Sequence, residues 1–375
     1  LNEVGAAIHI PPNATRVLKH WGCDFEDLQA TFCDAIKVYD KTGKLIFIPA
    51  STKELHEKLD TRDAWLLSHR VDLHNTLRKL AADERYEGNL KINLSSRVIS
   101  AAKIVLEDGT KHSADLLIGA DGVHSKVVTA VTQKTPERKS TGQNTFRFLV
   151  PMDKIRANTL TGPLFEKLGI ACQHVFVTYD RRLVIYPCRR GRLLNIVAVH
   201  PTKDTGLENE SSWLAGGKIE DLIDTYSEFS PELIEMCNMA EDLKLWSLAT
   251  RDPPDRFYKG RTVLVGDAAH PMLPHQGQGG AQSFEDGAAL GALFPANTTV
   301  DQIPRRLELY NKLRYHRAVT IMFMSKINDE RRGEMMEDLR KFVPDAKLPK
   351  SMFEYTWDSY VVRDAQQLLK NETRA

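Results

Sequence analysis

The sequence predicts an α/β protein of two lobes followed by a helical C-terminal segment. Three observations predict this class. Residues 262–265 form a short β-branched strand that leads through a glycine-rich loop into an apolar helix, as in parallel α/β units. Residues 143–199 contain several strands with short turns between them, which is typical of a mostly antiparallel sheet. Residues 303–328 carry apolar side chains at helical spacing.

Length and composition restrict the possible partners. A chain of 375 residues can form two lobes with a substantial core. Its formal net charge of +1 gives no reason to expect nucleic acid or an anionic membrane. No apolar run approaches the roughly 20 residues of a membrane helix. There is no CxxC pair and no signal peptide, so we expect a cytoplasmic protein with reduced thiols at Cys23, Cys33, Cys172, Cys188 and Cys237.

The first part of the chain alternates helices and strands. A pair of prolines leads into a helix over residues 13–21, which ends at a glycine. Residues 36–48 read as a hairpin with a Thr-Gly turn. A second helix begins near Arg70, where an isolated arginine is by default a solvated residue of the first turn. Further strands are expected over residues 90–94 and 98–106.

A buried strand is expected over residues 114–120. It ends at Asp121 and is followed by a helix over residues 123–131. An aspartate before a helix commonly caps the helix N-terminus, and this role explains Asp121 without any ligand.

The sheet over residues 143–199 contains two polar side chains that we consider as catalytic candidates, Arg147 and Tyr186. Alternation along a strand also places such residues on a solvated face, so this alternative stays open. Two short helices over residues 219–228 and 231–238 follow. The long helix over residues 303–328 is either part of the core or the face of a homodimer.

Residues 262–291 carry the strongest signal for a binding site. Asp267 stands at the end of the strand, prolines fix an extended turn, and three glycines allow backbone to approach a ligand. The helix that begins near Ala281 directs its free N–H groups to the same place. The pattern predicts a site for a phosphate-bearing or electron-rich ring ligand. A plain strand–loop–helix connection is the alternative.

The order of residues within this stretch is more specific than its glycines. GD, AAH, P, GQGGAQ and an acidic pair at Glu285 and Asp286 resemble the second flavin motif of the single-component FAD-dependent aromatic hydroxylases, the para-hydroxybenzoate and salicylate hydroxylase family with its fungal-type FAD monooxygenases. The resemblance implies that Asp267 holds the ribityl chain of FAD and that Pro274 lies beside the flavin ring. It also implies that Gly280 and Ala281 offer N–H groups to the ring.

Other blocks resemble the same family. The opening residues EVGAAIHIPPNATRVL resemble a block in which Gly5 and Ala6 meet the cofactor. The HRVDLHNTL block implies a contact of Arg70 with FAD. GADGVHSKV resembles the motif whose Asp121 meets the FAD pyrophosphate and which also serves NAD(P)H, although valine replaces the usual arginine at position 128. Arg147 and Tyr186 occupy positions of an arginine–tyrosine pair assigned to catalysis in related fungal enzymes.

The resemblance implies a fold and an activity. We expect a Rossmann-like FAD-binding lobe from residues 1–35, 69–130 and 240–300, an inserted substrate-binding sheet lobe from 36–68 and 131–239, and C-terminal helices from 301–375. No GxGxxG occurs in the sequence, so we expect the FAD-binding lobe to be truncated at its N-terminus.

The implied activity is hydroxylation of an aromatic or polycyclic small molecule, with NADPH or NADH as co-substrate, O2 as oxidant and a flavin C4a-hydroperoxide as oxygen donor. Two alternatives remain open. One is an FAD-dependent epoxidase or oxidase on the same fold, and the other is a truncated homologue that only binds. His270 and His275 have no partner ligands at metal-binding spacing, so we predict no metal site and expect His275 to face the substrate.

Overall fold

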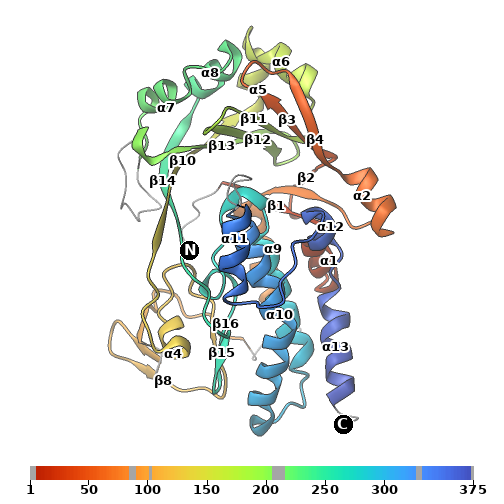
Figure 1. Ribbon diagram of the computed structural model, residues 1–375, viewed down its shortest axis with the longest axis vertical. Helices are drawn as coiled ribbons and strands as arrows, with labels where there is room; N and C mark the ends of the chain where they lie inside the picture. Colours follow the sequence, from red (N-terminus) through yellow and green to blue (C-terminus); the bar gives the residue numbers. More distant parts are fainter. Residues whose placement is uncertain (1–5, 84–89, 101–103, 205–215, 327–331, 373–375) are drawn as a thin grey trace.

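The computed structural model describes residues 6–83, 90–100, 104–204, 216–326 and 332–372. Its largest sheet has seven strands in the order β14-β10-β13-β12-β11-β3-β4, at the top of Figure 1. Neighbouring strands are antiparallel except for β11 and β3, as expected for the substrate lobe. The strands are β3 Ala35–Asp40, β4 Leu45–Ser51, β10 Lys139–Pro151, β11 Cys172–Val177, β12 Arg182–Cys188, β13 Leu193–Pro201 and β14 Glu241–Thr250.

The two faces of this sheet have different roles. Phe146, Phe148 and Val150 alternate along β10 and are buried on its outer face, where they pack under four helices (Figure 1). These helices are α5 Met152–Ala157, α6 Thr161–Leu168, α7 Ile219–Tyr226 and α8 Pro231–Asn238. Because side chains alternate between faces, Arg147 points to the opposite, inner face. That face turns toward the rest of the molecule.

Three smaller sheets lie outside the large one. Their strand orders are β1-β5-β2, β15-β16-β9 and β6-β7-β8. The strand β16 pairs in parallel with β9, as expected for the strand that precedes the glycine-rich loop. The bounds are β1 Ala7–Ile10, β2 Thr31–Phe32, β5 Leu66–His69, β6 Val98–Ser100, β7 Ile104–Leu106, β8 Lys111–His112, β9 Leu117–Gly119, β15 Tyr258–Lys259 and β16 Thr262–Leu264.

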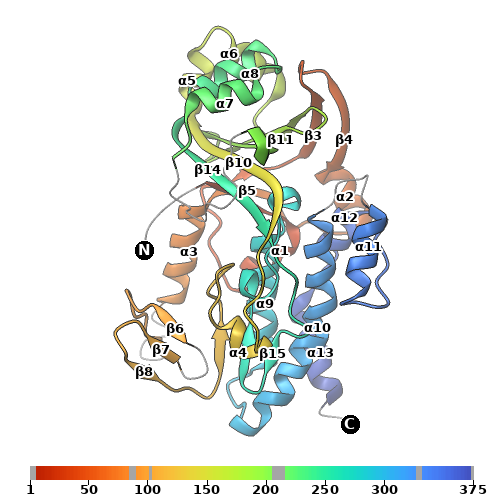
Figure 2. The ribbon, with the colours of Figure 1, turned by 60° about the vertical axis from the view of Figure 1, so that its left-hand side comes forward.

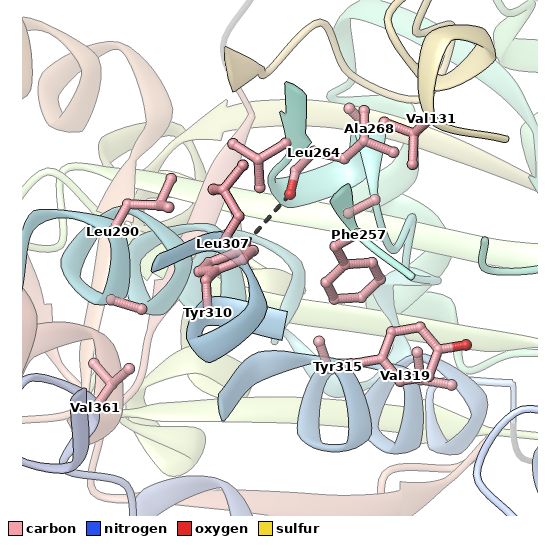
Figure 3. Close-up of a cluster of buried hydrophobic side chains, with 14 of the residues drawn as sticks. Val131, Phe257, Leu264, Ala268, Leu290, Leu307, Tyr310, Tyr315, Val319 and Val361 are labelled. Atoms are coloured by element: carbon pink, nitrogen blue, oxygen red, sulfur yellow. Dashed lines mark hydrogen bonds between the residues drawn. The ribbon is translucent and has the colours of Figure 1, made fainter. Parts of the chain in front are cut away.

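Helices fill the other end of the molecule, and Figure 2 shows α9, α10 and α13 running side by side. The long helix α10 belongs to the core, because Leu307, Tyr310 and Val319 are buried in the cluster drawn in Figure 3. The hydroxyl of Tyr310 donates a hydrogen bond of 3.3 Å to the carbonyl oxygen of Leu264. These contacts fix the strand that leads into the glycine-rich loop.

The three helices that run side by side are α9 Gly279–Leu293, α10 Ile303–Met324 and α13 Val361–Glu372. The other helices are α1 Pro12–His20, α2 Thr52–Leu59, α3 Arg70–Ala81, α4 Val128–Thr132, α11 Arg332–Arg340 and α12 Met352–Trp357. Within the described ranges no helix is both long and apolar enough to cross a bilayer.

Some predicted elements differ from the structure. Residues 90–94 form no strand, because their alternating apolar side chains find no surface to cover and stay about half exposed. The strand expected over 114–120 is shortened to β9, an edge strand of its sheet in which Ile118 is 46% exposed. The helix expected from residue 123 begins only at Val128.

The lobe boundary that the sequence places at residue 240 also differs. The sequence predicts residues 240–300 to lie in the cofactor lobe, but β14 pairs with β10 and is an edge strand of the large sheet. The strand β14 stays paired with β10 as far as Thr250, so the boundary of the sheet lies after this residue and not at residue 240.

Candidate functional site

A cleft of about 440 Å³ lies between the inner face of the large sheet and the glycine-rich loop. Its walls come from β1, the first residue of α3, the strands β10, β12 and β14, and the loop over residues 267–283. A volume of this size is typical of a small-molecule or cofactor site. Six of the residues predicted from the sequence line it: Arg70, Arg147, Tyr186, Asp267, Pro274 and Gly280.

Glycines give the loop a shape that other residues would strain. Gly266 has φ of +56° and Gly277 has φ of +61°, both in the left-handed region. A Cβ atom on Gly280 would lie 2.9 Å from Cδ1 of Ile8, across a narrow part of the cleft. The loop therefore allows backbone to meet a ligand where a side chain would block it.

The N-terminus of α9 opens on the same cleft. The first backbone hydrogen bond of the helix runs from the N–H of Gln282 to the carbonyl oxygen of Gln278 at 2.9 Å. The N–H groups of Gly279, Gly280 and Ala281 precede it and are free to donate to a ligand. Glycines at the helix start and orphan donors beside a concave wall fit the edge of a heteroaromatic ring.

Asp267 places a carboxyl group in this cleft. The enclosing walls raise its pKa, while His270, Arg70 and Arg251 act in the opposite direction. Asp267 is nevertheless an exposed residue. The backbone of the same turn is held from behind, because Arg251 donates to the carbonyl oxygens of Asp267, at 3.0 Å, and Ala268.

A buried network of charges supports the loop from below. Asp286 accepts hydrogen bonds from the N–H of Gly266 at 2.8 Å, from Nε2 of His270 at 2.7 Å and from Nε of Arg314 at 2.8 Å. Arg314 also pairs with Glu285, and Arg317 donates to both oxygens of Glu285 at 2.8 and 2.9 Å. Buried charges need such partners, so the network fixes the start of α9 relative to α10.

The acidic pair keeps its charge in spite of burial. Burial by itself raises the pKa of Glu285, but Arg317 and Arg314 outweigh it and hold this pKa far below the ordinary value. The pKa of Asp286 is also lowered, by His270 and Arg314 against the effect of burial. The acidic pair belongs to the motif that the sequence shows, whereas Arg314 and Arg317 lie outside that motif. Two arginines within the apolar pattern of a long helix are the signal that could have found them.

Arg147 and Tyr186 form the wall opposite the loop. The guanidinium of Arg147 stacks on the ring of Trp246 at 4.6 Å, and its Nε has no hydrogen-bond partner in the described part of the chain. Burial lowers the pKa of Arg147, and Arg70 adds to this effect, while Tyr186 opposes it. The hydroxyl of Tyr186 donates a hydrogen bond of 3.1 Å to the carbonyl oxygen of Ala7, and burial raises its pKa.

A second, smaller space adjoins the cleft on the inner face of the sheet, and we call it the inner chamber. Its volume is about 130 Å³. Arg147, Tyr186 and Pro274 line both spaces, so the chamber continues the cleft past the predicted position of the flavin ring. Its apolar ceiling is formed by side chains from β11, β12 and β13, namely Val175, Val184, Val197 and Val199.

Three predicted cofactor residues within the described ranges, Ala6, Asp121 and Ala281, are not among the residues that line the cleft. Gly5 lies outside the described residues. The carbonyl oxygen of Ala6 accepts a backbone hydrogen bond of 3.0 Å from the N–H of Arg70, and Ala281 is buried. The carboxylate of Asp121 accepts hydrogen bonds from Ser125 and from the N–H groups of residues 126 and 127. These bonds close the turn before α4, and α4 itself has no side-chain cap, so Asp121 stabilises the turn and does not cap the helix.

His270 and His275, the two histidines considered for metal binding, have different surroundings. Among the described residues no group of three or more metal-ligating side chains occurs. His270 is fully buried on Asp286, whereas His275 lines the inner chamber. Burial, assisted by Arg182, lowers the pKa of His275 to about 3, so this imidazole is neutral at physiological pH.

Known proteins are similar to this chain over most of its length. The family described as FAD binding domain matches residues 96–324. The chain is 32% identical to the FAD-dependent monooxygenase cfoG of Aspergillus candidus, over 96% of this chain and 84% of that protein. It is 32% identical to hispidin-3-hydroxylase of Neonothopanus nambi, over 84% and 77%. A salicylate hydroxylase in a substrate complex has a similar fold, with a TM-score of 0.73, 18% identity and coverage of 97% and 90%.

Proposed function

This chain belongs to the family of FAD-dependent aromatic hydroxylases, and we propose that it uses NADPH or NADH and O2 to hydroxylate an aromatic or polycyclic small molecule. One observation carries the proposal. A single cleft has the glycine-rich turn, the orphan N–H groups of α9 and the carboxyl group of Asp267 on one side, and Arg147 and Tyr186 on the other.

The residues on the loop side fit FAD. Asp267 would accept hydrogen bonds from ribityl hydroxyls, and the N–H groups of Gly280 and Ala281 would donate to the pyrimidine edge of the ring beside Pro274. Arg70, exposed at the start of α3, would contact the cofactor from the facing wall. When bound, FAD accepts a hydride from NAD(P)H and activates O2 for the transfer of one oxygen atom.

Three further predicted contacts belong to the same proposal. Gly5 and Ala6 would meet the cofactor through their backbone, and Asp121 would lie near the pyrophosphate. Val123 and His124, which follow Asp121, line the cleft and support this position.

The residues on the sheet side fit a phenolic substrate. Arg147 has an unused Nε donor, and the Tyr186 hydroxyl lies in the same wall. The Nε of Arg147 can donate to a phenolic oxygen, and the Tyr186 hydroxyl can do so when it exchanges its hydrogen bond to the carbonyl oxygen of Ala7. Such donation would stabilise the phenolate and make the ring electron-rich. Because burial raises the pKa of Tyr186, this side chain acts as a donor and not as a base. The names of hispidin-3-hydroxylase and of a 3-hydroxybenzoate 6-hydroxylase of Polaromonas naphthalenivorans point to the same substrate class.

The reaction is tested by following one oxygen atom. The purified chain is given FAD, NADPH or NADH, a panel of hydroxybenzoates and 18O2, and the product is analysed by mass spectrometry. We expect a product that gains one labelled oxygen atom while the second atom becomes water. A product that loses two hydrogens without gaining oxygen would indicate an oxidase, and a labelled epoxide an epoxidase. A chain that binds no FAD would contradict the proposal altogether.

The cellular setting is part of the proposal. All five cysteines are unpaired, and burial raises the pKa of each thiol, which suits a reducing cytoplasm. The homodimer considered from the sequence would need a surface other than the buried side of α10. Sedimentation velocity of the FAD-loaded chain would establish the oligomeric state.

A further inference from the structure

The strand β4 carries a row of exposed apolar side chains. Leu45 is 46% exposed, Ile46 53%, Phe47 54% and Ile48 48%. The strand is the last one in the order of the large sheet, and Figures 1 and 2 show it at the border of the molecule. Single exposed apolar residues are ordinary on a protein surface, whereas four consecutive ones on an edge strand indicate an interaction site.

One side of the β4 backbone has no strand partner. Within the described residues β4 pairs with β3 alone, so the N–H and C=O groups along its outer side are free to pair. The two register shifts against β3 twist the strand but leave its apolar side chains exposed. Charged side chains and proline, which protect natural edge strands, stand only on either side of the row, at Lys44 and Pro49.

A second copy of the same strand fits this edge. Two antiparallel strands related by a two-fold axis satisfy each other's backbone groups, so one surface supplies both halves of the interface. A two-fold axis at Ile46 places Leu45 of each copy opposite Phe47 of the other. The same axis places Pro49, which has no N–H to donate, opposite Gly43 in the turn before the strand.

The area of this edge suits a reversible dimer. Four apolar side chains that are about half exposed form a patch of roughly 300–400 Å². Two such patches, with the backbone between them, would bury on the order of 1,000 Å², which is near the lower limit of specific interfaces. We therefore expect a dissociation constant in the micromolar range.

We propose that β4 is a dimerisation edge, where a second copy of this chain pairs antiparallel about a two-fold axis at Ile46 and joins the two large sheets into one. The inference does not depend on the proposed reaction, because residues 45–48 line neither the cleft nor the inner chamber. It also supplies a dimer surface that is separate from the buried side of α10.

Sedimentation velocity of the full chain tests the dimer. We expect the wild type to change from monomer to dimer across the micromolar range of protein concentration. Ile46→Glu puts two carboxylates directly opposite each other and should weaken dimerisation by at least about a hundredfold. Ile99→Glu is the matched control, because Ile99 is 50% exposed on β6, outside the large sheet, and its change should leave dimerisation as in the wild type. A wild type that stays monomeric would overturn the proposal, and so would an Ile46→Glu variant that dimerises equally well.

Cysteine cross-linking tests the position of the axis. Opposite residues of an antiparallel pair have Cα atoms about 4.5–5.5 Å apart, which is within the reach of a disulfide. Ile46→Cys should therefore form a covalent dimer with oxidised glutathione, detected on a denaturing gel without reductant. Ile48→Cys should not, because its two copies would lie roughly 13 Å apart along the strands.

The wild type, whose five cysteines are unpaired, measures the background of this reaction. Equal cross-linking of the two variants, or none above background in Ile46→Cys, would overturn the pairing. If Ile46→Glu does not fold, the wild-type sedimentation and the cysteine variants still decide the question.

Discussion

The Nε atom of Arg314 lies 2.8 Å from Oδ1 of Asp286, and both side chains are fully removed from solvent. The other oxygen of Asp286 accepts the N–H of Gly266, which opens the glycine-rich turn. A charge on α10 is thereby connected through one carboxylate to the backbone of the cleft. The shape of the proposed FAD site thus depends on residues that touch no ligand.

Removing Arg314 should destabilise the fold severely. Arg314→Met would leave Glu285 and Asp286 buried with fewer partners, and breaking a buried pair in this way costs about 3–5 kcal/mol. Urea unfolding followed by circular dichroism gives the free energy. Arg305→Gln is the control, because Arg305 pairs with Glu372 at the exposed surface and its loss should leave the midpoint unchanged. Similar midpoints for the two variants would contradict the assigned role of the network.

Stability should decrease in acid because of the same network. The pKa of Glu285 is depressed in the folded protein, while the unfolded chain takes up this proton near the ordinary value of 4.5. The stabilising contribution is therefore complete above about 4.5 and is lost as the pH falls below it toward the folded pKa. Urea midpoints between neutral pH and pH 3 measure the decline. Glu285→Gln, although less stable at neutral pH, should show a shallower decline, and a decline as steep as that of the wild type would refute the assignment.

Gly280→Ala should impair FAD binding more than folding. The new Cβ would meet the flexible end of Ile8 at 2.9 Å, so a small shift of Ile8 relieves the clash but narrows the cleft. We expect FAD affinity to fall by about tenfold while the thermal midpoint stays close to that of the wild type.

Gly291→Ala is the matched control on the same helix. A Cβ at Gly291 meets nothing within 4 Å, and alanine there should stabilise the helix by roughly 0.5–1 kcal/mol without changing FAD affinity. Flavin fluorescence quenching measures both affinities. Equal FAD affinities of the two variants would show that Gly280 does not approach the cofactor.

Asp267→Asn should weaken FAD binding and remove a pH dependence. The pKa of Asp267 is raised by burial above its ordinary 3.8, so its carboxylate takes up a proton at a higher pH than an exposed aspartate does. If the ionised form accepts ribityl hydroxyls, wild-type affinity should fall as the pH drops through this raised pKa. The variant should bind about tenfold more weakly at neutral pH and lack this fall.

Equilibrium dialysis at a series of pH values measures this effect. Asp252→Asn, which alters an exposed pair with Lys139, should behave as the wild type. A variant at position 267 with the affinity and pH profile of the wild type would exclude Asp267 from the FAD site.

Local sequence patterns predicted the elements whose structure depends mainly on neighbouring residues in the sequence. Alternation identified β10 to β13, and glycines with prolines identified the loop before α9. The same patterns failed over residues 90–94, where apolar alternation occurs without a surface to cover. Periodicity records which residues could share a face, and tertiary packing decides whether that face has a partner.

The glycine-rich loop of the site could be predicted from the sequence, but the buried charge network that holds it could not. Asp267, Pro274 and Gly280 follow one another in sequence, so their proximity could be read from it. The contact of Asp286 with Arg314 spans 28 residues and depends on how α9 and α10 pack, which no local pattern encodes.

Arg16 of α1 donates a hydrogen bond of 3.1 Å to the carbonyl oxygen of Trp357, and Arg317 holds the carbonyl oxygens of residues 355 and 356 at 2.8 and 2.9 Å. The first helix and the last part of the chain are thus bound together across 341 residues. During synthesis, α1 must wait for nearly the whole polypeptide to leave the ribosome before it gains these contacts. A nascent chain that stalls earlier would present this flank of the core uncovered, as a target for chaperones.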